Sequence, residues 1–293
     1  MSESLQSVET IIARLITDKP VRKTPYQVKG LIMRDFSNEG IIPFINGSYR
    51  NDFLYPRVQV KILNEQLYFF GIKEGVKPIQ NLIDQIKVMN FGNITFKIEG
   101  FEVETGNNHF MSSPRMIRYK FLTPWIALNE ANLSKYKFLY GNERSSFLTR
   151  LLSQNIVFLA KEMGLELHSK IYSKLTLQSP YPKIVDEGKL GAFHGEFQTN
   201  FILPNYMGIG NGITKGYGTV FSYFNPSDFS FNVSKLENDF KNKSMEEDLP
   251  DDLEENGVSS EDIPKSRRKV SSEVKDTKKN EPNYNTLKYH KRH

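Results

Sequence analysis

Apolar and polar residues alternate over several short stretches of the first hundred residues. In 57–62 the side chains of Val58, Val60 and Ile62 fall on one face, and polar residues occupy the positions between them. A period of two is typical of a strand with one buried face. The other stretches that predict strands are 8–16, 67–72 and 94–98.

Two stretches between these strands have a helical period instead. Thr24 precedes Pro25, a pair typical of an N-cap followed by proline at the first helical position, and apolar residues then recur at intervals of three and four. Pro78 opens a second stretch of the same kind. The order strand, helix, strand, strand, helix, strand predicts a ferredoxin-like domain.

The second half of the chain shows related elements in a less regular form. A helical stripe is predicted over 148–163, and strands are predicted over 117–122, 171–177, 193–203 and 220–224. No internal repeat links the two halves, so their pairing rests on element order alone. We expect an α+β protein with two ferredoxin-like (RRM-like) domains in tandem, over 1–114 and 115–236.

The last segment, 237–293, has a different composition. Its first part, 237–262, holds 11 acidic and 2 basic residues, and 263–293 holds 10 basic and 3 acidic residues. Few apolar residues accompany these charges, so burial cannot offset the entropy of ordering, and we expect a disordered tail. Its basic end is either a solvated tail without a role of its own or a contact for nucleic acid.

Composition excludes several kinds of site. The chain has no cysteine, which excludes disulfides, cysteine-ligated zinc, iron–sulfur clusters and a cysteine nucleophile, and two of its five histidines lie in the last four residues. Without the tail the net charge is +7, because 27 basic residues face 20 acidic ones, which is compatible with a polyanionic partner. We expect no signal peptide, no membrane span and a cytoplasmic location.

Five glycines fall within eleven residues near the end of the second half. The segment 208–218 reads GIGNGITKGYG, and this spacing rules out a helix and permits close approach of backbone amides. Neither a phosphate-binding P-loop nor a dinucleotide fingerprint fits, because a strand follows and not a helix. The segment is either a flexible hairpin or a loop packed between two domains that offers amides and Lys215 to a nucleic-acid backbone.

Further motifs occur in a fixed order along 10–225. They are Lys29-Gly30, the segments FLYPRVQVK (53–61), FGIKEG (70–75) and TPWIALN (123–129), and the approach to the glycine-rich loop from Asn200. Together they resemble the CRISPR-associated RAMP superfamily, and within it the endoribonucleases that cut precursor CRISPR RNA at each repeat. The resemblance implies metal-independent attack of a 2′-hydroxyl on the adjacent phosphate, which leaves a 2′,3′-cyclic phosphate and a 5′-hydroxyl.

One departure from this family concerns the expected acid/base groups. Ile45 and Gly47 stand where similar proteins carry histidines, and no histidine precedes His109. Histidine suits such chemistry because its pKa lies near the operating pH. The candidates that remain at this position are Ser48, Tyr49, Arg50 and Lys61, whose groups orient a hydroxyl or stabilise charge on phosphate oxygens. The alternative is an ordinary polar loop with Tyr55 in the core.

The resemblance also implies an RNA-binding face. The expected contacts are Lys29, Arg34, Arg57 and Lys61 from the first domain, and Lys215 with Gly208, Gly210, Gly212, Gly216 and Gly218 from the second. No cofactor and no metal are implied. The expected partner is a CRISPR repeat RNA hairpin, with other subunits of a CRISPR effector complex as further candidates.

Other interpretations remain open. A catalytically inactive subunit that holds the repeat RNA is favoured by the missing histidines, whereas two full domains argue against a scaffold subunit. His194 shares a strand face with Glu196, which is either an acid/base pair or, more commonly, a solvated face. His109 and His168 read as surface residues, and Trp125 reads as a core residue.

Overall fold

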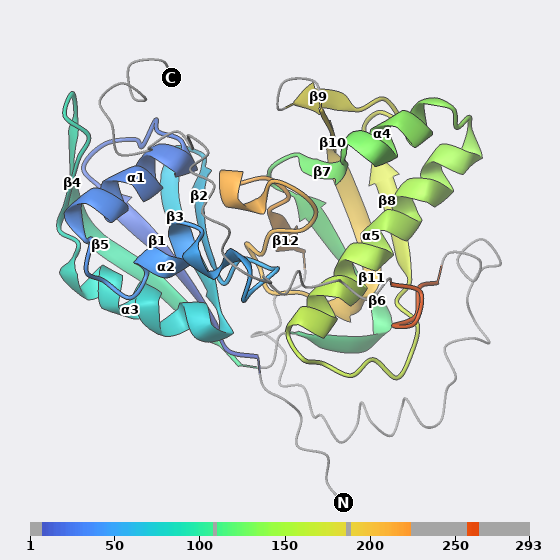
Figure 1. The fold of residues 1–293 in the computed structure, drawn as a ribbon, viewed down its shortest axis with the longest axis horizontal. Coiled ribbons are helices and arrows are strands. Elements are labelled where there is room, and N and C mark those ends of the chain that lie inside the picture. Colours follow the sequence, from blue (N-terminus) through green and yellow to red (C-terminus); the bar gives the residue numbers. More distant parts are fainter. Residues whose placement is uncertain (1–7, 108–109, 186–188, 224–256, 264–293) are drawn as a thin grey trace, which may run out of the picture.

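The protein folds into two α+β domains that lie side by side (Figure 1). The structure is a computed structural model and describes residues 8–107, 110–185, 189–223 and 257–263. Within this described part, no helix is both long and apolar enough to cross a membrane.

The first domain is built on a five-stranded antiparallel sheet of order β2-β3-β1-β5-β4. Its elements are β1 (Thr10–Thr17), α1 (Pro25–Asp35), α2 (Ile42–Ile45), η1 (Ser48–Arg50), β2 (Val58–Leu63), β3 (Gln66–Ile72), η2 (Lys73–Gly75), α3 (Val76–Gln85), β4 (Val88–Asn90) and β5 (Thr95–Gly106), where η marks a 3₁₀ helix. Without β4 at the edge, this is the ferredoxin-like order that the sequence predicts, and that prediction is confirmed.

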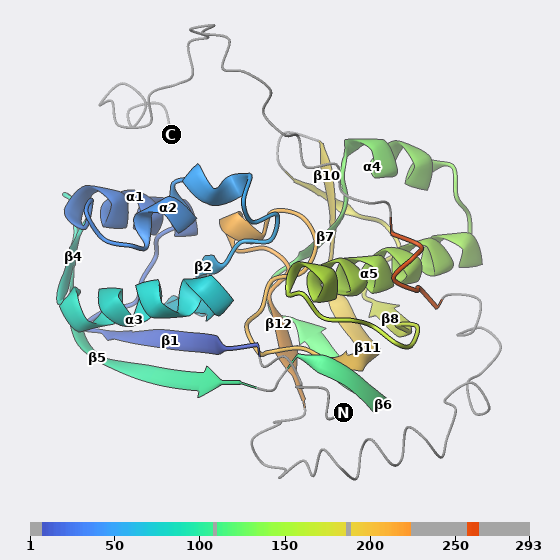
Figure 2. The same ribbon diagram turned by 60° about the horizontal axis from the view of Figure 1, so that its bottom comes forward.

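The helices of the first domain cover one face of its sheet (Figure 2). Helix α1 begins where the sequence predicts, because the Thr24 side chain accepts a hydrogen bond from the Gln27 amide and Pro25 occupies the first turn. Ile11 and Phe69 face this helical layer and are fully buried. Ile12 and Phe70, one position further along, belong instead to a core that continues into the second domain.

The second domain repeats this plan with one helix missing. Its elements are β6 (Met111–Phe121), β7 (Trp125–Leu128), α4 (Glu130–Lys137), α5 (Asn142–Glu162), β8 (Ser173–Leu177), β9 (Lys183–Val185), β10 (Leu190–Phe193), β11 (Gly195–Ile202), η3 (Ile213–Lys215) and β12 (Val220–Ser222). The order β12-β6-β11-β8 is again ferredoxin-like, with α5 after the first strand and the glycine-rich loop in place of the second helix. A small sheet, β7-β10-β9, and α4 are additions to this plan.

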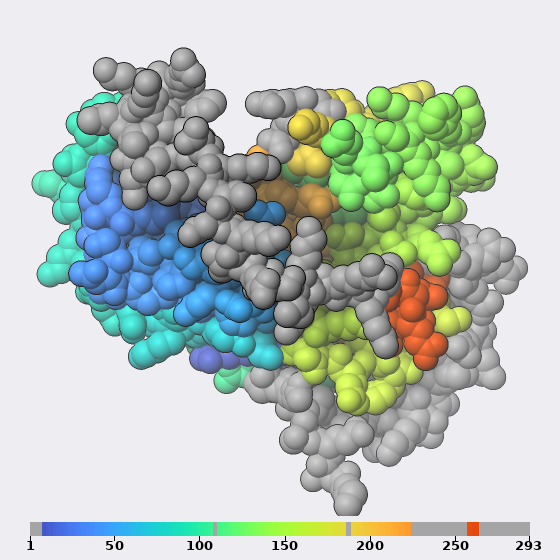
Figure 3. Space-filling view, in the orientation of Figure 1, coloured from blue at the N-terminus to red at the C-terminus, as the bar shows by residue number. Residues whose placement is uncertain are grey.

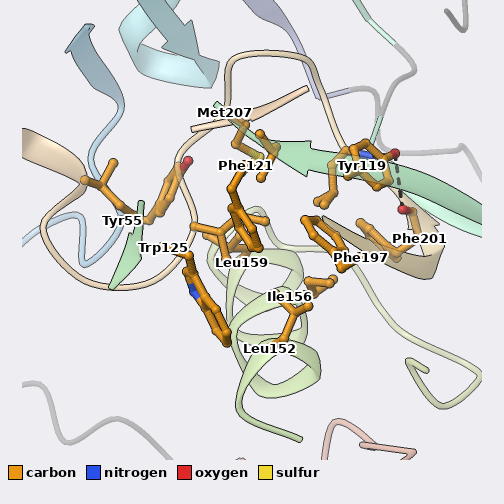
Figure 4. Packing of buried hydrophobic residues seen from close by; sticks show 14 of the residues in the cluster. Tyr55, Tyr119, Phe121, Trp125, Leu152, Ile156, Leu159, Phe197, Phe201 and Met207 are labelled. Carbon is orange, nitrogen blue, oxygen red and sulfur yellow. Dashed lines mark hydrogen bonds between the residues drawn. The ribbon is translucent and has the colours of Figure 1, made fainter. Parts of the chain in front are cut away.

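Aromatic residues fill the core of the second domain (Figure 4). Trp125 is fully buried and stacks on Phe121 at a centroid distance of 5.5 Å, which confirms the prediction that it is a core residue. Phe193, Phe197 and Phe201 are all buried. Tyr55 enters the same cluster from the first domain, so this core extends across the junction between the two domains.

Part of the expected disordered tail packs against the second domain. Val258 is fully buried, and its backbone exchanges two hydrogen bonds with Ile171, of 2.9 and 3.0 Å. Lys161 of α5 donates a hydrogen bond to the Ser260 carbonyl. This segment, 257–263, departs from the expectation of a tail without contacts, and the rest of 237–293 lies outside the described residues.

Two truncations should show how much the docked segment 257–263 contributes to stability. A chain that ends at residue 263 should keep its melting temperature, whereas one that ends at residue 256 should lose about 3–10 °C, because it exposes the site that buries Val258. Differential scanning calorimetry of both truncations measures this difference. Equal melting temperatures would show that 257–263 contributes nothing to stability.

Candidate functional site

Two lysines from different domains meet at the glycine-rich loop. The Lys29 amine of α1 donates a hydrogen bond of 2.8 Å to the Thr214 carbonyl in η3. Burial and, after it, the neighbouring charge of Lys215 hold the pKa of Lys29 below its usual value. Figure 3 shows a hollow between α1 and the β9–β10 side of the second domain, with the loop at its floor. The pair therefore places positive charge where a phosphate can approach.

The polar face of β2 is buried against the glycine-rich loop. The Gln59 amide nitrogen donates to the Tyr55 hydroxyl (2.7 Å), the Tyr55 hydroxyl donates to the Gly208 carbonyl (2.9 Å), and the Gly208 amide donates to Gln59 Oε1 (3.0 Å). This closed ring of three hydrogen bonds gives each of these buried groups a partner. Burial raises the pKa of Tyr55 well above its usual value, which confirms the alternative that Tyr55 is a core residue.

Lys61 lies two residues beyond Gln59 on β2 and is fully buried. Its Nζ donates to Thr219 Oγ1 (3.0 Å), and Thr219 Oγ1 in turn donates to the Gly216 carbonyl (3.2 Å), which also accepts from Thr123 Oγ1 (2.8 Å). Burial lowers the pKa of Lys61 to about 7. The expectation that Lys61 acts on RNA is therefore wrong for this fold, because its amine is enclosed by the domain junction.

Arg57 is also withdrawn from the surface. Its guanidinium pairs with Glu74 (2.8 Å), lies over the Phe53 ring, and donates to the Glu162 carbonyl (3.0 Å) at the end of α5. Lys73 donates to the neighbouring Met163 carbonyl (3.0 Å). Cations are favourable at a helix C-terminus, so the contact of Arg57 with the end of α5 stabilises the junction between the domains. Because its guanidinium is enclosed there, Arg57 does not face RNA, contrary to the sequence-based expectation.

The glycines of the loop serve close packing. A Cβ at Gly218 would lie 1.9 Å from the Ile209 carbonyl oxygen, and one at Gly210 would lie 2.7 Å from the Ile126 carbonyl oxygen. Gly210, Gly212, Gly216 and Gly218 all have positive φ, which favours glycine. The alternative of a flexible hairpin is therefore wrong, and the loop is packed between the domains.

The loop amides are largely committed within the protein. The amides of Gly208, Gly216 and Gly218 donate to Gln59, to the Ile213 carbonyl and to the Pro124 carbonyl. These three cannot also bind phosphate in this conformation, which corrects the expectation for Gly208, Gly216 and Gly218. Lys215 and Thr214, by contrast, are exposed.

The candidate catalytic segment follows α1 and precedes β2. The Tyr49 ring packs edge-on against Phe44 and Phe53 at 4.9 and 5.8 Å, which leaves the side chain partly exposed and fixes its position. Ser48 and Arg50 share the same 3₁₀ helix, η1, and are exposed. Gly47 has a φ of +91°, so a histidine at this position would be strained.

Other candidates lie away from this junction. Arg34 pairs with Asp35 and donates to the Asn90 carbonyl of β4, at the opposite edge of the first sheet. Glu196 accepts hydrogen bonds from Tyr223 and Arg118, which hold its pKa below the usual value and make it a weak base.

The histidine candidates gain no catalytic partner among the described residues. His194 and Glu196 line one cavity of about 310 Å³, but Glu196 is engaged with its other neighbours, which favours the solvated-face interpretation. His168 is exposed, and His109 lies outside the described residues. Within the described ranges, no three His, Asp or Glu side chains gather closely enough to hold a metal ion.

Sequence reasoning missed the polar groups that anchor the loop, namely Gln59, Thr123 and Thr219. Each is at least half-buried at the domain junction. The available signal was the strand FLYPRVQVK, whose polar positions were assigned to solvent because the second domain that covers them is far away in sequence.

Comparisons with known proteins bear on this geometry. Residues 6–108 match the family model of the Cas6b N-terminal domain, and residues 111–223 match that of the Cas6b C-terminal domain. The chain belongs to the Cas6b family. The resemblance to CRISPR-associated RAMP proteins that the motifs indicated is thereby confirmed.

Solved structures support the Cas6b assignment. A crystal structure of Cas6b is 27% identical, with a TM-score of 0.64 over 74% of this chain and 99% of that chain. A crystal structure described as the CRISPR RNA processing endoribonuclease Cas6b is 25% identical, with a TM-score of 0.55 over 73% of this chain and 99% of that chain. An uncharacterized protein from Methanocaldococcus jannaschii is 33% identical over 138 residues, which are 45% of this chain and 94% of that protein.

Proposed function

We propose that this Cas6b-family chain binds CRISPR repeat RNA and cuts precursor CRISPR RNA into guide RNAs. The observation that carries the proposal is the match of both Cas6b domains over residues 6–108 and 111–223. The similar Cas6b whose crystal structure names it a CRISPR RNA processing endoribonuclease supports the same activity. The cation pair at the domain junction supplies a site suited to a polyanion.

The RNA backbone would bind across the hollow at Lys29 and Lys215. Both amines lie at the loop that joins the domains, and their mutual repulsion, which contributes to the lowered pKa of Lys29, is relieved by a phosphate between them. A ligand that binds there contacts both domains at once. The closed ring of hydrogen bonds among Gln59, Tyr55 and Gly208 keeps the loop in place for this contact, together with the hydrogen bond between Lys61 and Thr219.

The cut would follow from attack of the 2′-hydroxyl on the adjacent phosphate, with no metal required. Tyr49, Ser48 and Arg50 are the groups that we propose for this step. The partly exposed Tyr49 hydroxyl would orient the nucleophile, and the Arg50 guanidinium would stabilise charge on the phosphate oxygens. With no histidine in 42–57, we expect slow turnover.

The second candidate function is a catalytically inactive subunit that holds the repeat RNA. The absence of histidine from 42–57 favours it, since proton transfer by a well-placed histidine would be lost while the binding surface remains. Other subunits of a CRISPR effector complex are then the natural partners. Cleavage assays separate the two functions.

RNA binding should depend on the lysine pair. Lys215→Ala is expected to weaken repeat-hairpin binding roughly tenfold and to reduce the slope of log affinity against log salt by about 1, because one phosphate contact is lost. Lys77→Ala, at an exposed lysine of α3, is the matched control and should leave the affinity and the salt slope unchanged. Filter binding at several salt concentrations measures the slope, and an unchanged slope in the Lys215 variant would count against this site.

Cleavage should proceed in EDTA and depend on Tyr49. Tyr49→Phe is expected to lower the single-turnover rate by about 10-fold or more while hairpin affinity stays the same, because only a hydroxyl is removed. A 2′-deoxy nucleotide at the cut site should abolish cleavage, since it removes the nucleophile.

Each alternative leaves a distinct result in this assay. Cleavage that survives the deoxy substitution, or that needs magnesium, would rule out the proposed reaction. Tight binding without cleavage of any repeat RNA would support the inactive subunit. A Tyr49→Phe rate equal to that of the native chain would remove Tyr49 from the reaction and leave Ser48 and Arg50.

A further inference from the structure

The three most exposed large apolar side chains of the described residues lie on one part of the second domain. Phe138, Tyr140 and Tyr181 are 78%, 74% and 71% exposed. They belong to the α4–α5 connection and to the β8–β9 connection, next to the elements added to the ferredoxin-like plan. We call Phe138, Tyr140, Tyr181 and the adjoining Arg144 the ring surface.

Arg144 holds this surface in place. Its guanidinium lies over the rings of Tyr136 and Tyr181, at 5.3 and 5.2 Å from their centroids, and its Nε donates a hydrogen bond of 2.7 Å to the Leu139 carbonyl. The Tyr140 amide donates to the Glu143 carboxylate (3.1 Å). The backbone that carries the exposed rings is therefore fixed before any ligand arrives, which lowers the entropy cost of binding.

A small cavity opens between the same two connections. Its volume is about 200 Å³, and its lining includes Gly141, Arg144 and Pro180. Gly141 follows Tyr140 and Pro180 precedes Tyr181, so the backbone that lines the cavity continues directly into the two residues that carry exposed rings. The volume is below the roughly 300–1,000 Å³ of sites for drug-sized ligands and suits a single planar ring.

The charges around the rings favour a nucleic acid over a protein. The segments 129–145 and 178–185 contain four cations and two carboxylates, and the Glu143 carboxylate already accepts from a backbone amide. The cations are Lys135, Lys137, Arg144 and Lys183. Exposed rings beside cations are the arrangement that binds unpaired bases, which stack on the rings while their phosphates contact the cations.

We propose that the ring surface binds an unpaired segment of RNA, with bases stacked on Tyr140 and Tyr181 and one base in the adjoining cavity. The proposal rests on the proposed function, since it gives a place to RNA that continues beyond the hairpin. Figure 1 shows β10 and α4 between the glycine-rich loop and the α4–α5 connection, so the RNA strand would pass over them to reach the rings. The ring surface would add a second RNA contact, separate from the one at Lys29 and Lys215.

The test compares two RNAs on the full chain. One is the repeat hairpin alone, and the other is the same hairpin with an unpaired oligouridine flank. The native chain should bind the flanked RNA roughly tenfold more tightly, and the triple variant Phe138→Ala, Tyr140→Ala and Tyr181→Ala should bind both RNAs equally. Tyr140→Phe with Tyr181→Phe should retain the preference, because the rings remain.

A matched control and a fold check accompany these variants. Val88→Ala removes an exposed apolar side chain from β4 of the first domain and should preserve the preference. The rings carry little buried area, so the triple variant should melt at the native temperature. Equal affinity of the native chain for the two RNAs, or a triple variant that keeps the preference, would overturn the proposal while leaving hairpin binding intact.

Two further results keep the proposals distinguishable. If the hairpin is not bound at all, the proposed function fails, and the ring surface then stands only if isolated oligouridine binds the native chain and not the triple variant. If sedimentation shows that the triple variant changes oligomeric state and RNA preference is unaffected, the surface is a protein interface and the proposal is wrong.

Discussion

The Lys61→Met variant is expected to be more stable than the native chain, by about 3 kcal/mol at pH 8, despite losing a hydrogen bond. Lys61 is fully buried at the domain junction, where its amine donates to the neutral Thr219 hydroxyl and, among the described residues, pairs with no carboxylate. A cation enclosed in this way is costly, whereas methionine fills similar space without charge. Thr219 keeps its own hydrogen bond to the Gly216 carbonyl.

The effect should depend on pH in a defined direction. The pKa of Lys61 is about 7 in the folded chain, against 10.5 as its ordinary value, so between these pH values the unfolded chain carries a proton that the folded chain lacks. Stability of the native chain should therefore rise with pH from about 7 to 10.5, by about 1.4 kcal/mol per unit from this residue. Below pH 7 the penalty is complete, and above 10.5 it is absent.

Urea unfolding at pH 7, 8, 9 and 10 tests this expectation. The difference between the native chain and Lys61→Met should shrink as pH rises, and subtraction of the two curves removes the other titrating groups. Lys77→Met replaces an exposed lysine and should follow the native curve. A constant difference across this pH range would show that Lys61 is charged in the folded chain throughout.

The Gly218→Ala variant is expected to lose more than 4 kcal/mol of stability and, with it, RNA binding. The new Cβ would lie 1.9 Å from the Ile209 carbonyl oxygen, and both partners are backbone, so neither can move without displacing the loop. The φ of +67° adds strain of its own. The hydrogen bond from the Gly218 amide to the Pro124 carbonyl would break, as would the one from the Ile209 amide to the Gly218 carbonyl.

Gly47→Ala is the matched control for backbone strain. Its φ is +91°, yet nothing lies within 4 Å of the added Cβ, so it should cost only about 1–3 kcal/mol. Gly216→Ala should fall between the two, since the nearest atom is Pro25 Cγ at 3.1 Å. Thermal unfolding gives the order, and a Gly218 variant no less stable than the Gly47 variant would contradict the packing role of the loop.

Substitutions in the glycine-rich loop are poor probes of direct RNA contacts, because an added side chain also disturbs the packing of the loop. At Gly210 the added Cβ would meet the Ile126 carbonyl and the Trp125 indole, so loss of binding there would report a displaced loop. Lys215→Ala is the cleaner probe, because its side chain is exposed.

Much of the fold arises from local pattern. The alternation in 57–62, the cap at Thr24 and the order of elements predict the first ferredoxin-like domain, because a period of two or of 3.6 decides which face is buried. The glycine spacing in 208–218 excludes a helix and leaves a flexible hairpin or a packed loop, and the close contacts in the structure decide for the packed loop. The family resemblance, and not the periodicity, singles out Lys29 and Lys215 as candidate groups, and the structure brings them together.

The errors share one cause. Arg57 and Lys61 stand at polar positions of a strand with one apolar face, and a local pattern assigns such positions to solvent. The second domain covers this face through residues more than a hundred positions away, among them Glu162 and Thr219. The docked segment 257–263 was missed for the same reason, since Val258 is one apolar residue in a charged stretch and its site is formed by Ile171.

The sequence by itself determined the two domains and the family, because these depend on residue types at short spacing. Only the tertiary structure decided which cations lie at the glycine-rich loop and which are enclosed where the domains join. Lys29 and Arg57 look alike along the chain, and the difference between them is the segment that each contacts: Lys29 donates to the Thr214 carbonyl of the glycine-rich loop, and Arg57 donates to the Glu162 carbonyl at the end of α5. Burial depends on contacts between distant segments, and no local pattern contains them.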